Sequence, residues 1–254
     1  MTSLIEVKNL TKLYGQQGSV CQALHDVNLE IEAGEFVAVM GPSGSGKTTL
    51  LNIISTIDKP TQGHIILDRR ETGTLKEKEL ALFRRDVIGF VFQEFNLLNN
   101  MTIRDNIALP LTLNNVNTEK ILQKVGELST LFGIDSQLDK YPYQLSGGQK
   151  QRAAVCRALV NNPKILFADE PTGALDSKAA SELLTCFRNV RNQYGTTVVM
   201  VTHDASAASY CDRVLFLKDG VVSGKLETNG NVEEFFKKIL NMVALLGGER
   251  NERL

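Results

Sequence analysis

The chain has 254 residues, 43% hydrophobic and 22% charged, a composition typical of a folded globular protein with a sizeable core. Lys and Arg number 28 and Asp and Glu 29, so the formal net charge of −1 does not favour binding to nucleic acid or anionic lipid. The sequence shows neither a secretory signal nor a run of about 18 apolar residues that could span a bilayer. We therefore expect a soluble, cytoplasmic protein with no nucleic-acid partner.

The four cysteines are widely spaced, and none lies in a C-x-x-C pair. Such spacing favours neither a zinc site nor a disulfide framework, so free thiols in a reducing compartment are expected. They are Cys21, Cys156, Cys186 and Cys211.

The first forty residues predict strands. Leu4–Leu10 and Leu24–Ile31 alternate between apolar and polar residues, and the turn-rich Gly15–Ser19 lies between them. Phe36–Met40 is a short apolar run, which indicates a strand buried on both faces. An apolar helix start, Leu50–Ile54, comes after a glycine-rich loop.

The second half predicts a largely parallel α/β core. Apolar residues recur at helical spacing over Ile121–Leu131, within a mostly helical middle region. Strand-like runs then alternate with helical segments at Ile165–Ala168, Thr197–Val201 and Val214–Leu217. The helical middle region is therefore expected to be a lobe inserted into the core.

The last segment predicts a helix, because apolar residues recur at i, i+3, i+4 and i+7 between Val232 and Val243. Packing on the chain's own core is the expected arrangement, and a partner-binding or dimer helix is the alternative. Gly247–Gly248 and the charged residues after them predict a frayed end.

The segment Gly41–Thr48 fits the P-loop pattern at every fixed position, between a predicted strand and a predicted helix. Glycines let backbone N–H groups point at phosphate oxygens, and the helix N-terminus favours the same anion. Lys47 is expected to neutralise the β- and γ-phosphates, and Thr48 to ligate Mg²⁺. The predicted nucleotide-binding residues are Gly41, Ser43, Gly44, Ser45, Gly46, Lys47, Thr48 and Thr49.

Two acids follow the apolar strand Ile165–Ala168. Asp169 at the strand end can approach the Mg²⁺ shell. Glu170 is expected to accept the proton of the water that attacks the γ-phosphate, a contribution on the order of 10²–10⁴-fold.

The most discriminating motif is Leu145–Gln149, which precedes a predicted helix. A hydroxyl and backbone N–H groups at a helix N-terminus form a second anion cradle. Two cradles and one acid pair suggest a single ATP held between two surfaces. The predicted contacts are Ser146, Gly147, Gly148 and Gln149.

With these motifs the sequence resembles, over essentially its whole length, the nucleotide-binding domain of ABC transporters. The resemblance implies a P-loop NTPase core of mostly parallel sheet, with an antiparallel β subdomain and an inserted α-helical subdomain. It implies one domain over 1–254, made of a core (1–94 and 160–230), a helical lobe (95–159), and a C-terminal helix and tail (231–254). It also implies ATP and Mg²⁺ as cofactors and a head-to-tail homodimer with ATP at the interface.

Further site residues follow from the resemblance. Tyr14 resembles the aromatic residue that stacks on adenine, and Gln93 the glutamine that reaches Mg²⁺ or the attacking water. His203 resembles the histidine that contacts the γ-phosphate, and Asp176 the aspartate at the dimer seam. Gly173 departs from the family pattern, which often has serine before Ala-Leu-Asp.

Three flanking segments are similar to the ATPases of bacitracin-type antimicrobial-peptide resistance transporters, within the macrolide-export and lipoprotein-release group. That resemblance implies a permease with an extracellular domain, often beside a sensor histidine kinase, and a location on the inner face of the cell membrane. The segments are Phe92–Leu98, Pro171–Lys178 and Asp204–Cys211.

Other functions stay open at this point. The chain could serve a cell-division or lipoprotein-release system of the same group. A soluble ABC ATPase of DNA repair or translation is disfavoured, because the chain has no long coiled coil, zinc hook or second ATPase domain. A non-catalytic subunit is disfavoured by the presence of Glu170, His203 and the Leu145–Gln149 motif.

Overall fold

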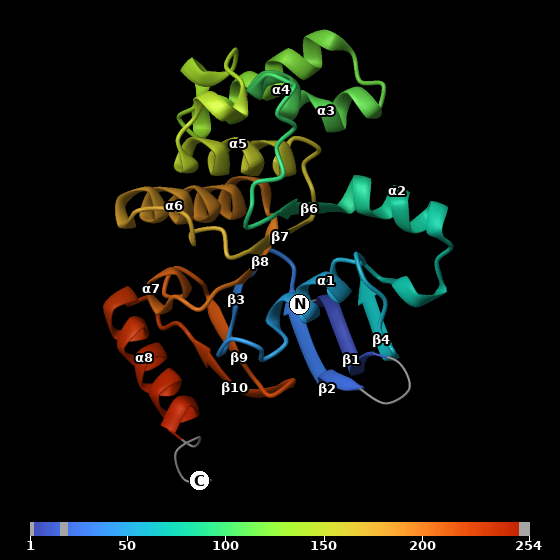
Figure 1. Ribbon diagram of the computed structural model, residues 1–254, viewed down its shortest axis with the longest axis vertical. Coiled ribbons are helices and arrows are strands. Elements are labelled where there is room, and N and C mark those ends of the chain that lie inside the picture. Colours follow the sequence, from blue (N-terminus) through green and yellow to red (C-terminus); the bar gives the residue numbers. More distant parts are fainter. Residues whose placement is uncertain (1–2, 16–19, 249–254) are drawn as a thin grey trace. The chain divides into compact units, whose positions relative to one another are not determined.

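The computed structural model describes residues 3–15 and 20–248 (Figure 1). Most of the predicted turn Gly15–Ser19 and the charged end therefore lie outside the described residues. The chain divides into two compact units, residues 1–80 with 199–254, and residues 81–198. Each unit is described by itself.

The first unit contains an antiparallel sheet in the order β2-β1-β4-β5. Ile5 on the central strand pairs with Ile31 on one side and with Leu67 on the other, and all three side chains are fully buried. Both strands predicted near the N-terminus are confirmed and are longer than expected. The strands are β1 (Ser3–Tyr14), β2 (Cys21–Glu32), β4 (Gln62–Leu67) and β5 (Arg70–Glu71).

The other strands of the first unit carry the glycine-rich loop. All five residues of β3 (Phe36–Met40) are buried, as the apolar run predicts. β3 pairs in parallel with β9 (Arg213–Lys218), and β9 pairs antiparallel with β10 (Val221–Glu227). The chain leaves β3 through the loop and enters α1 (Lys47–Ile54). A short helix η1 (Thr72–Thr74) precedes α2 (Glu77–Val87), in which the chain passes into the second unit.

The C-terminal helix α8 (Val232–Gly248) packs against β10 and against α7 (Ala205–Ala208). Phe235 and Ile239 are buried there, so the prediction that the helix covers its own core is correct for this part of the stripe. The exposed fractions of three other apolar residues are large, at 39% for Val232, 44% for Leu240 and 42% for Val243. The helix continues through both glycines, and the charged end that the sequence predicts to fray lies outside the described residues.

In the second unit, β6 (Ile88–Val91) pairs in parallel with β7 (Ile165–Asp169). The boundary between the units falls within β8 (Thr197–Val201), where the Thr197 amide donates to the Lys164 carbonyl. Helix α6 (Ser177–Tyr194) follows β7 and buries four apolar residues, Leu183, Leu184, Phe187 and Val190. The predicted strands of the α/β core are thus confirmed.

All regular structure between residues 95 and 159 is helical, as predicted. Figure 1 shows α3, α4 and α5 gathered at one end of the second unit, with α6 alongside α5. The boundaries predicted for this lobe stay a prediction. Among the described residues, no helix is long and apolar enough to cross a membrane. The lobe's elements are α3 (Ile103–Leu113), α4 (Thr118–Leu131), η2 (Asp135–Gln137), η3 (Pro142–Gln144) and α5 (Gly147–Leu159).

Candidate nucleotide site

The loop after β3 has a path that only glycine permits at two positions. A Cβ on Gly41 would lie 2.0 Å from the Leu217 carbonyl oxygen. Gly46 has a φ of 99°, and a Cβ there would lie 2.5 Å from the Ala23 carbonyl oxygen. Because the backbone lies against its neighbours without side chains between, the loop forms a cradle of main-chain atoms of the kind that binds phosphate.

Lys47 lies at the centre of this cradle. Its Nζ donates to the carbonyls of Gly41 (2.9 Å) and Pro42 (3.0 Å). Ser43, Gly44 and Thr48 are exposed. Ser45 differs from them, because it is only 2% exposed and its hydroxyl is buried beneath the loop without a hydrogen-bond partner. The predicted contact of Ser45 with nucleotide stays a prediction.

The N-terminus of α1 is open. Its N-cap residue is Gly46, which has no side chain to cap the N–H groups of the first turn. These groups and the Lys47 ammonium fit an anionic phosphate. The described residues contain no cluster of three His, Cys, Asp or Glu side chains that could hold a metal.

Tyr14 ends β1 with a ring that is 42% exposed. Its hydroxyl donates to Asp58 (2.7 Å), and the Lys12 Nζ lies 2.9 Å from the same carboxylate and 4.7 Å from the ring centroid. Burial and the bond to Asp58 raise the pKa of Tyr14, while a bond from Thr49 acts to lower it. Burial acts to raise the pKa of Asp58, but the bonds from Lys12 and Tyr14 outweigh it and lower that pKa.

Asp58 was not among the site residues predicted from the sequence. An acidic residue just after the P-loop helix is the only sequence signal for it, because Lys12 and Tyr14 are more than forty positions away. The contact fixes the orientation of the tyrosine hydroxyl, and the Lys12 ammonium lies over one face of the ring.

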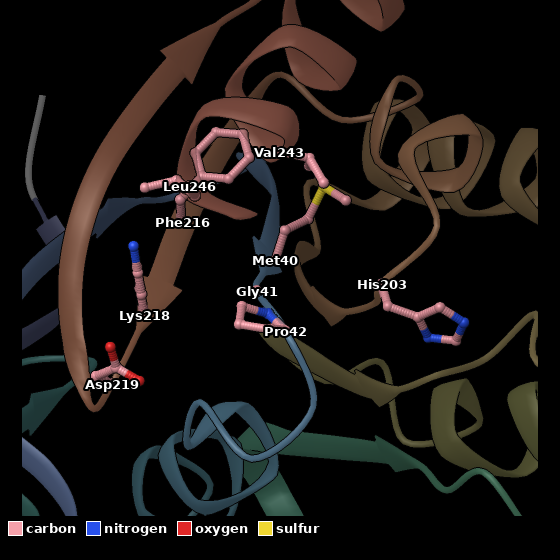
Figure 2. Close-up of a pocket in the computed structure, with 9 residues that line it drawn as sticks. All are labelled: Met40, Gly41, Pro42, His203, Phe216, Lys218, Asp219, Val243 and Leu246. Carbon is pink, nitrogen blue, oxygen red and sulfur yellow. The ribbon is translucent and has the colours of Figure 1, made fainter. Parts of the chain in front are cut away.

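His203 is exposed and follows β8. It lies between Thr202, which is fully buried, and Asp204, whose backbone N–H donates to the Thr202 hydroxyl (3.0 Å). Within the first unit, His203 shares a cavity of 310 Å³ with Gly41 and Pro42. Figure 2 shows its imidazole on one side of these two residues and Lys218 on the other. His203 thus lies beside Gly41 and Pro42, the two residues whose carbonyls accept from Lys47.

In the second unit, Asp169 ends β7 and Glu170 follows with a φ of 45°. A positive φ at a residue other than glycine stores strain, which tends to occur at functional sites. The Gly173 N–H donates to the Glu170 carbonyl (3.0 Å) and closes a tight turn. Both acids are half-buried.

Gly173 brings two predicted catalytic residues together. A Cβ at this position would lie 3.8 Å from the Glu170 Cβ and 4.0 Å from the Gln93 Nε2. The glutamine predicted to reach the attacking water is thus close to the acid predicted to accept its proton. The space beside them is large enough for a Cβ.

Asp176 has a local role in addition to the predicted one. It is the N-cap of α6, and its side chain accepts from the Ala179 N–H at 2.9 Å. Substitution of Asp176 would therefore affect α6 as well as any dimer seam.

Ser146 is the N-cap of α5 in a capping box. The Gln149 N–H donates to the Ser146 hydroxyl oxygen (3.4 Å), and the Ser146 N–H donates to the Gln149 side-chain carbonyl (3.0 Å). A Cβ on Gly147 would lie 3.4 Å from the Ala174 carbonyl oxygen. The motif thus lies beside the Gly173–Asp176 loop of its own chain.

The structure therefore gathers the predicted site residues into two groups, one in each unit. The roles assigned to the individual residues stay predictions. The first group comprises Tyr14, Gly41, Ser43, Gly44, Ser45, Gly46, Lys47, Thr48, Thr49 and His203, and the second Gln93, Ser146, Gly147, Gly148, Gln149, Asp169, Glu170 and Asp176.

Comparison with known proteins agrees with this geometry. The family model described as ABC transporter matches residues 24–173. The chain is 46% identical over 251 residues to the bacitracin export ATP-binding protein BceA of Halalkalibacterium halodurans, which covers 98% of this chain and 99% of that protein. It is 41% identical over 236 residues to the macrolide export ATP-binding/permease protein MacB of Syntrophobacter fumaroxidans, covering 92% of this chain and 33% of MacB.

A solved structure is also similar. The dimeric, post-hydrolysis state of the ATP-binding cassette MJ0796 with ADP and Pi superposes with a TM-score of 0.84 at 43% identity. The match covers 89% of this chain and all of that one.

Proposed function

The chain belongs to the ABC transporter family as an ATP-binding, ATP-hydrolysing subunit, and we propose that it powers a separate membrane permease in resistance to bacitracin-like peptides. The similarity to BceA over almost the full length of both proteins carries this proposal. MacB, a third of which the chain matches, is named as an ATP-binding and permease protein, and this supports coupling of the chain to a permease.

In the proposed cycle, two copies of the chain associate head to tail. The Ser146–Gln149 motif of one copy faces the ATP held by the P-loop of the other. The Ser146 hydroxyl oxygen already accepts the Gln149 N–H, so its proton is available to donate to a phosphate oxygen. The dimeric state of MJ0796 supports this arrangement.

Within each copy, Lys47 neutralises phosphate charge, and His203 contacts the γ-phosphate. Thr48, Asp169 and Gln93 are the proposed Mg²⁺ ligands, and Mg²⁺ supplies the charge neutralisation that phosphoryl transfer requires. Glu170 accepts the proton of the attacking water, and Gln93 orients that water. The exposed ring of Tyr14 stacks on adenine.

In this proposal the chain works on the inner face of the membrane, docked on a permease with an extracellular domain and, through it, beside a sensor kinase. A cell-division or lipoprotein-release system is the alternative.

Substitution of Glu170 tests the chemistry. Glu170→Gln should bind ATP normally and lower the rate of turnover on the order of 10²–10⁴-fold, because the amide cannot accept the proton. It should also trap a dimer on gel filtration with Mg-ATP. Glu182→Gln is the matched control, because Glu182 pairs with Arg152 on the surface and should turn over normally. Near-normal hydrolysis by Glu170→Gln would remove the proposed role.

Deletion of the gene tests the substrate class. The deletion strain should become sensitive to bacitracin-like and lantibiotic peptides, and wild-type protein but not Glu170→Gln should restore resistance. Unchanged sensitivity, together with a defect in division or in lipoprotein release, would favour the alternative. A tagged chain purified from detergent-solubilised membranes should carry the permease with it.

A further inference from the structure

The turn after β6 is strained. The Phe95 N–H donates to the Phe92 carbonyl (3.3 Å) and the Asn96 N–H to the Glu94 carbonyl (2.6 Å), which folds Phe92–Asn96 into two successive tight turns. Phe95 has a φ of 61° and Asn96 a φ of 50°. Residues other than glycine persist in this backbone region only where their surroundings hold them there. We call Phe92–Asn96 the Gln93 turn.

Arg157 of α5 holds the strained part of the Gln93 turn. Its guanidinium donates from Nη1 to the Asn96 carbonyl (2.5 Å) and from Nη2 to the Phe95 carbonyl (2.9 Å). It pairs with no carboxylate among the described residues, and its half-buried position lowers the pKa of Arg157. Two carbonyls of one turn are therefore the partners of this charge, in charge-assisted bonds that are stronger than neutral ones.

A second side chain fixes the segment just beyond the turn. The amide of Asn106, which is fully buried, accepts from the Leu98 N–H (2.7 Å) and donates to the Leu98 carbonyl (3.1 Å). It also donates to the carbonyls of Met101 and Thr102. Asn106 fixes the segment at Leu98. The bonds from Arg157 act on Phe95 and Asn96, the part of the segment that is nearer to Gln93.

The helix that carries Arg157, α5, has Ser146 of the Leu145–Gln149 motif as its N-cap, and we call α5 the signature helix. Near its other end, a Cβ on Gly89 of β6 would lie 2.4 Å from the Ala158 carbonyl oxygen. The strand that leads to Gln93 thus packs directly on the backbone of α5, with no side chain between. A shift of α5 would move the guanidinium and the turn together.

We propose that Arg157 is a positioning residue, which holds the Gln93 turn in its left-handed conformation and ties the Gln93 amide to the signature helix. The inference rests on the function proposed above for Gln93 in hydrolysis. Arg157 does not touch ATP in this account. It sets the position of the residue that orients the water.

The first test replaces the donors of Arg157 and keeps its apolar stem. Arg157→Met should lower kcat for ATP about tenfold or more and raise the Mg²⁺ concentration for half-maximal turnover, while ATP affinity stays within about twofold. Arg157→Lys keeps the positive charge but loses the pair of guanidinium donors, and it should recover part of the rate. Arg152→Met is the matched control on the same helix, because Arg152 bonds Glu182 and the Phe132 carbonyl, and it should keep normal Mg²⁺ dependence.

The second test separates positioning from folding of α5. Asn96→Gly removes the steric cost of the left-handed backbone. In the Arg157→Met background it should restore kcat at least about threefold, which is the positive coupling expected of two residues that act on one turn. If Asn96→Gly restores the melting temperature but not kcat, or restores neither, Arg157 acts through general stability and the inference is overturned.

The third test separates this inference from the proposed function. If Gln93→Ala turns over at the wild-type rate, the role of Gln93 fails and the inference fails with it. If Gln93→Ala is slow but Arg157→Met has normal kcat and Mg²⁺ dependence, only the inference fails. Slow turnover in both, with no further loss in the double variant, is the expected result.

Discussion

The helices α1 and α5 both begin at a glycine-rich motif that the sequence predicts to bind phosphate, yet their first turns differ. The α1 N-terminus has Gly46 as its N-cap and no side-chain cap. The α5 N-terminus is closed by the Ser146–Gln149 capping box. A side-chain cap stabilises a helix start typically by about 1 kcal/mol, whereas the first turn of an uncapped helix relies on water or a ligand.

This difference fits two distinct roles. The open end of α1 suits the tight binding of one nucleotide by one chain. The closed end of α5 keeps its shape in the single chain and offers the serine hydroxyl to a ligand that another chain brings. Two substitutions test whether the two helix starts differ in this way, and a third tests the contact at the C-terminal end of α1. They follow from the largest expected effect to the smallest.

Gly46→Ala should give the largest effect. The new Cβ would lie 2.5 Å from the Ala23 carbonyl, at a φ of 99°. We expect the free energy of unfolding to fall by more than about 2 kcal/mol and ATP binding to be lost, as measured by denaturation and by binding of a fluorescent ATP analogue. Gly44→Ala is the control, because Gly44 also has positive φ (78°) but no neighbour within 4 Å. Equal losses in both variants would contradict the idea that the cradle depends on close backbone packing.

Ser146→Ala should have an intermediate effect on activity. Loss of the cap should cost about 1 kcal/mol of stability, and loss of the hydroxyl should lower kcat while ATP binding to the single chain stays unchanged. Thr102→Ala is the matched control, because Thr102 caps α3 in a capping box with Asp105. It should lose similar stability, measured by thermal unfolding, and keep its kcat. Weaker ATP binding by the Ser146 variant alone would show that both helix starts serve one chain.

Asp58→Asn should have the smallest effect, visible in acid. The backbone N–H of Asp58 donates to the Asn52 carbonyl of α1, and its carboxylate binds Lys12 and Tyr14 of β1. Because the pKa of Asp58 is lowered by folding, its stabilising contribution is present above the unfolded value of about 3.9 and is lost as the pH falls through the lower folded value. The variant should therefore show a flatter loss of stability below about pH 4 than wild type, in urea unfolding at several pH values. If the variant and the wild type lost stability equally below about pH 4, Asp58 would not anchor the C-terminal end of α1.

Much of the site could be read from sequence, because its motifs are contiguous. The glycines of the P-loop, the acids after β7 and the Ser146–Gln149 motif each lie within a few residues, where backbone geometry alone fixes their relation. The buried strand Phe36–Met40 and the helical region 95–159 were also predictable, since hydrophobic periodicity reports local structure.

Other features required the tertiary structure. Asp58 reaches Tyr14 across 44 positions, and Arg157 reaches Asn96 across 61. The exposed Val232, Leu240 and Val243 belong to a periodic apolar stripe, of which the neighbouring elements fully bury Phe235 and Ile239. The sequence by itself determined which residues can bind a phosphate, because that property lies in glycine conformation and side-chain chemistry. Only the tertiary structure decided which side chains hold those residues in place, because such contacts form between segments that are distant in the chain.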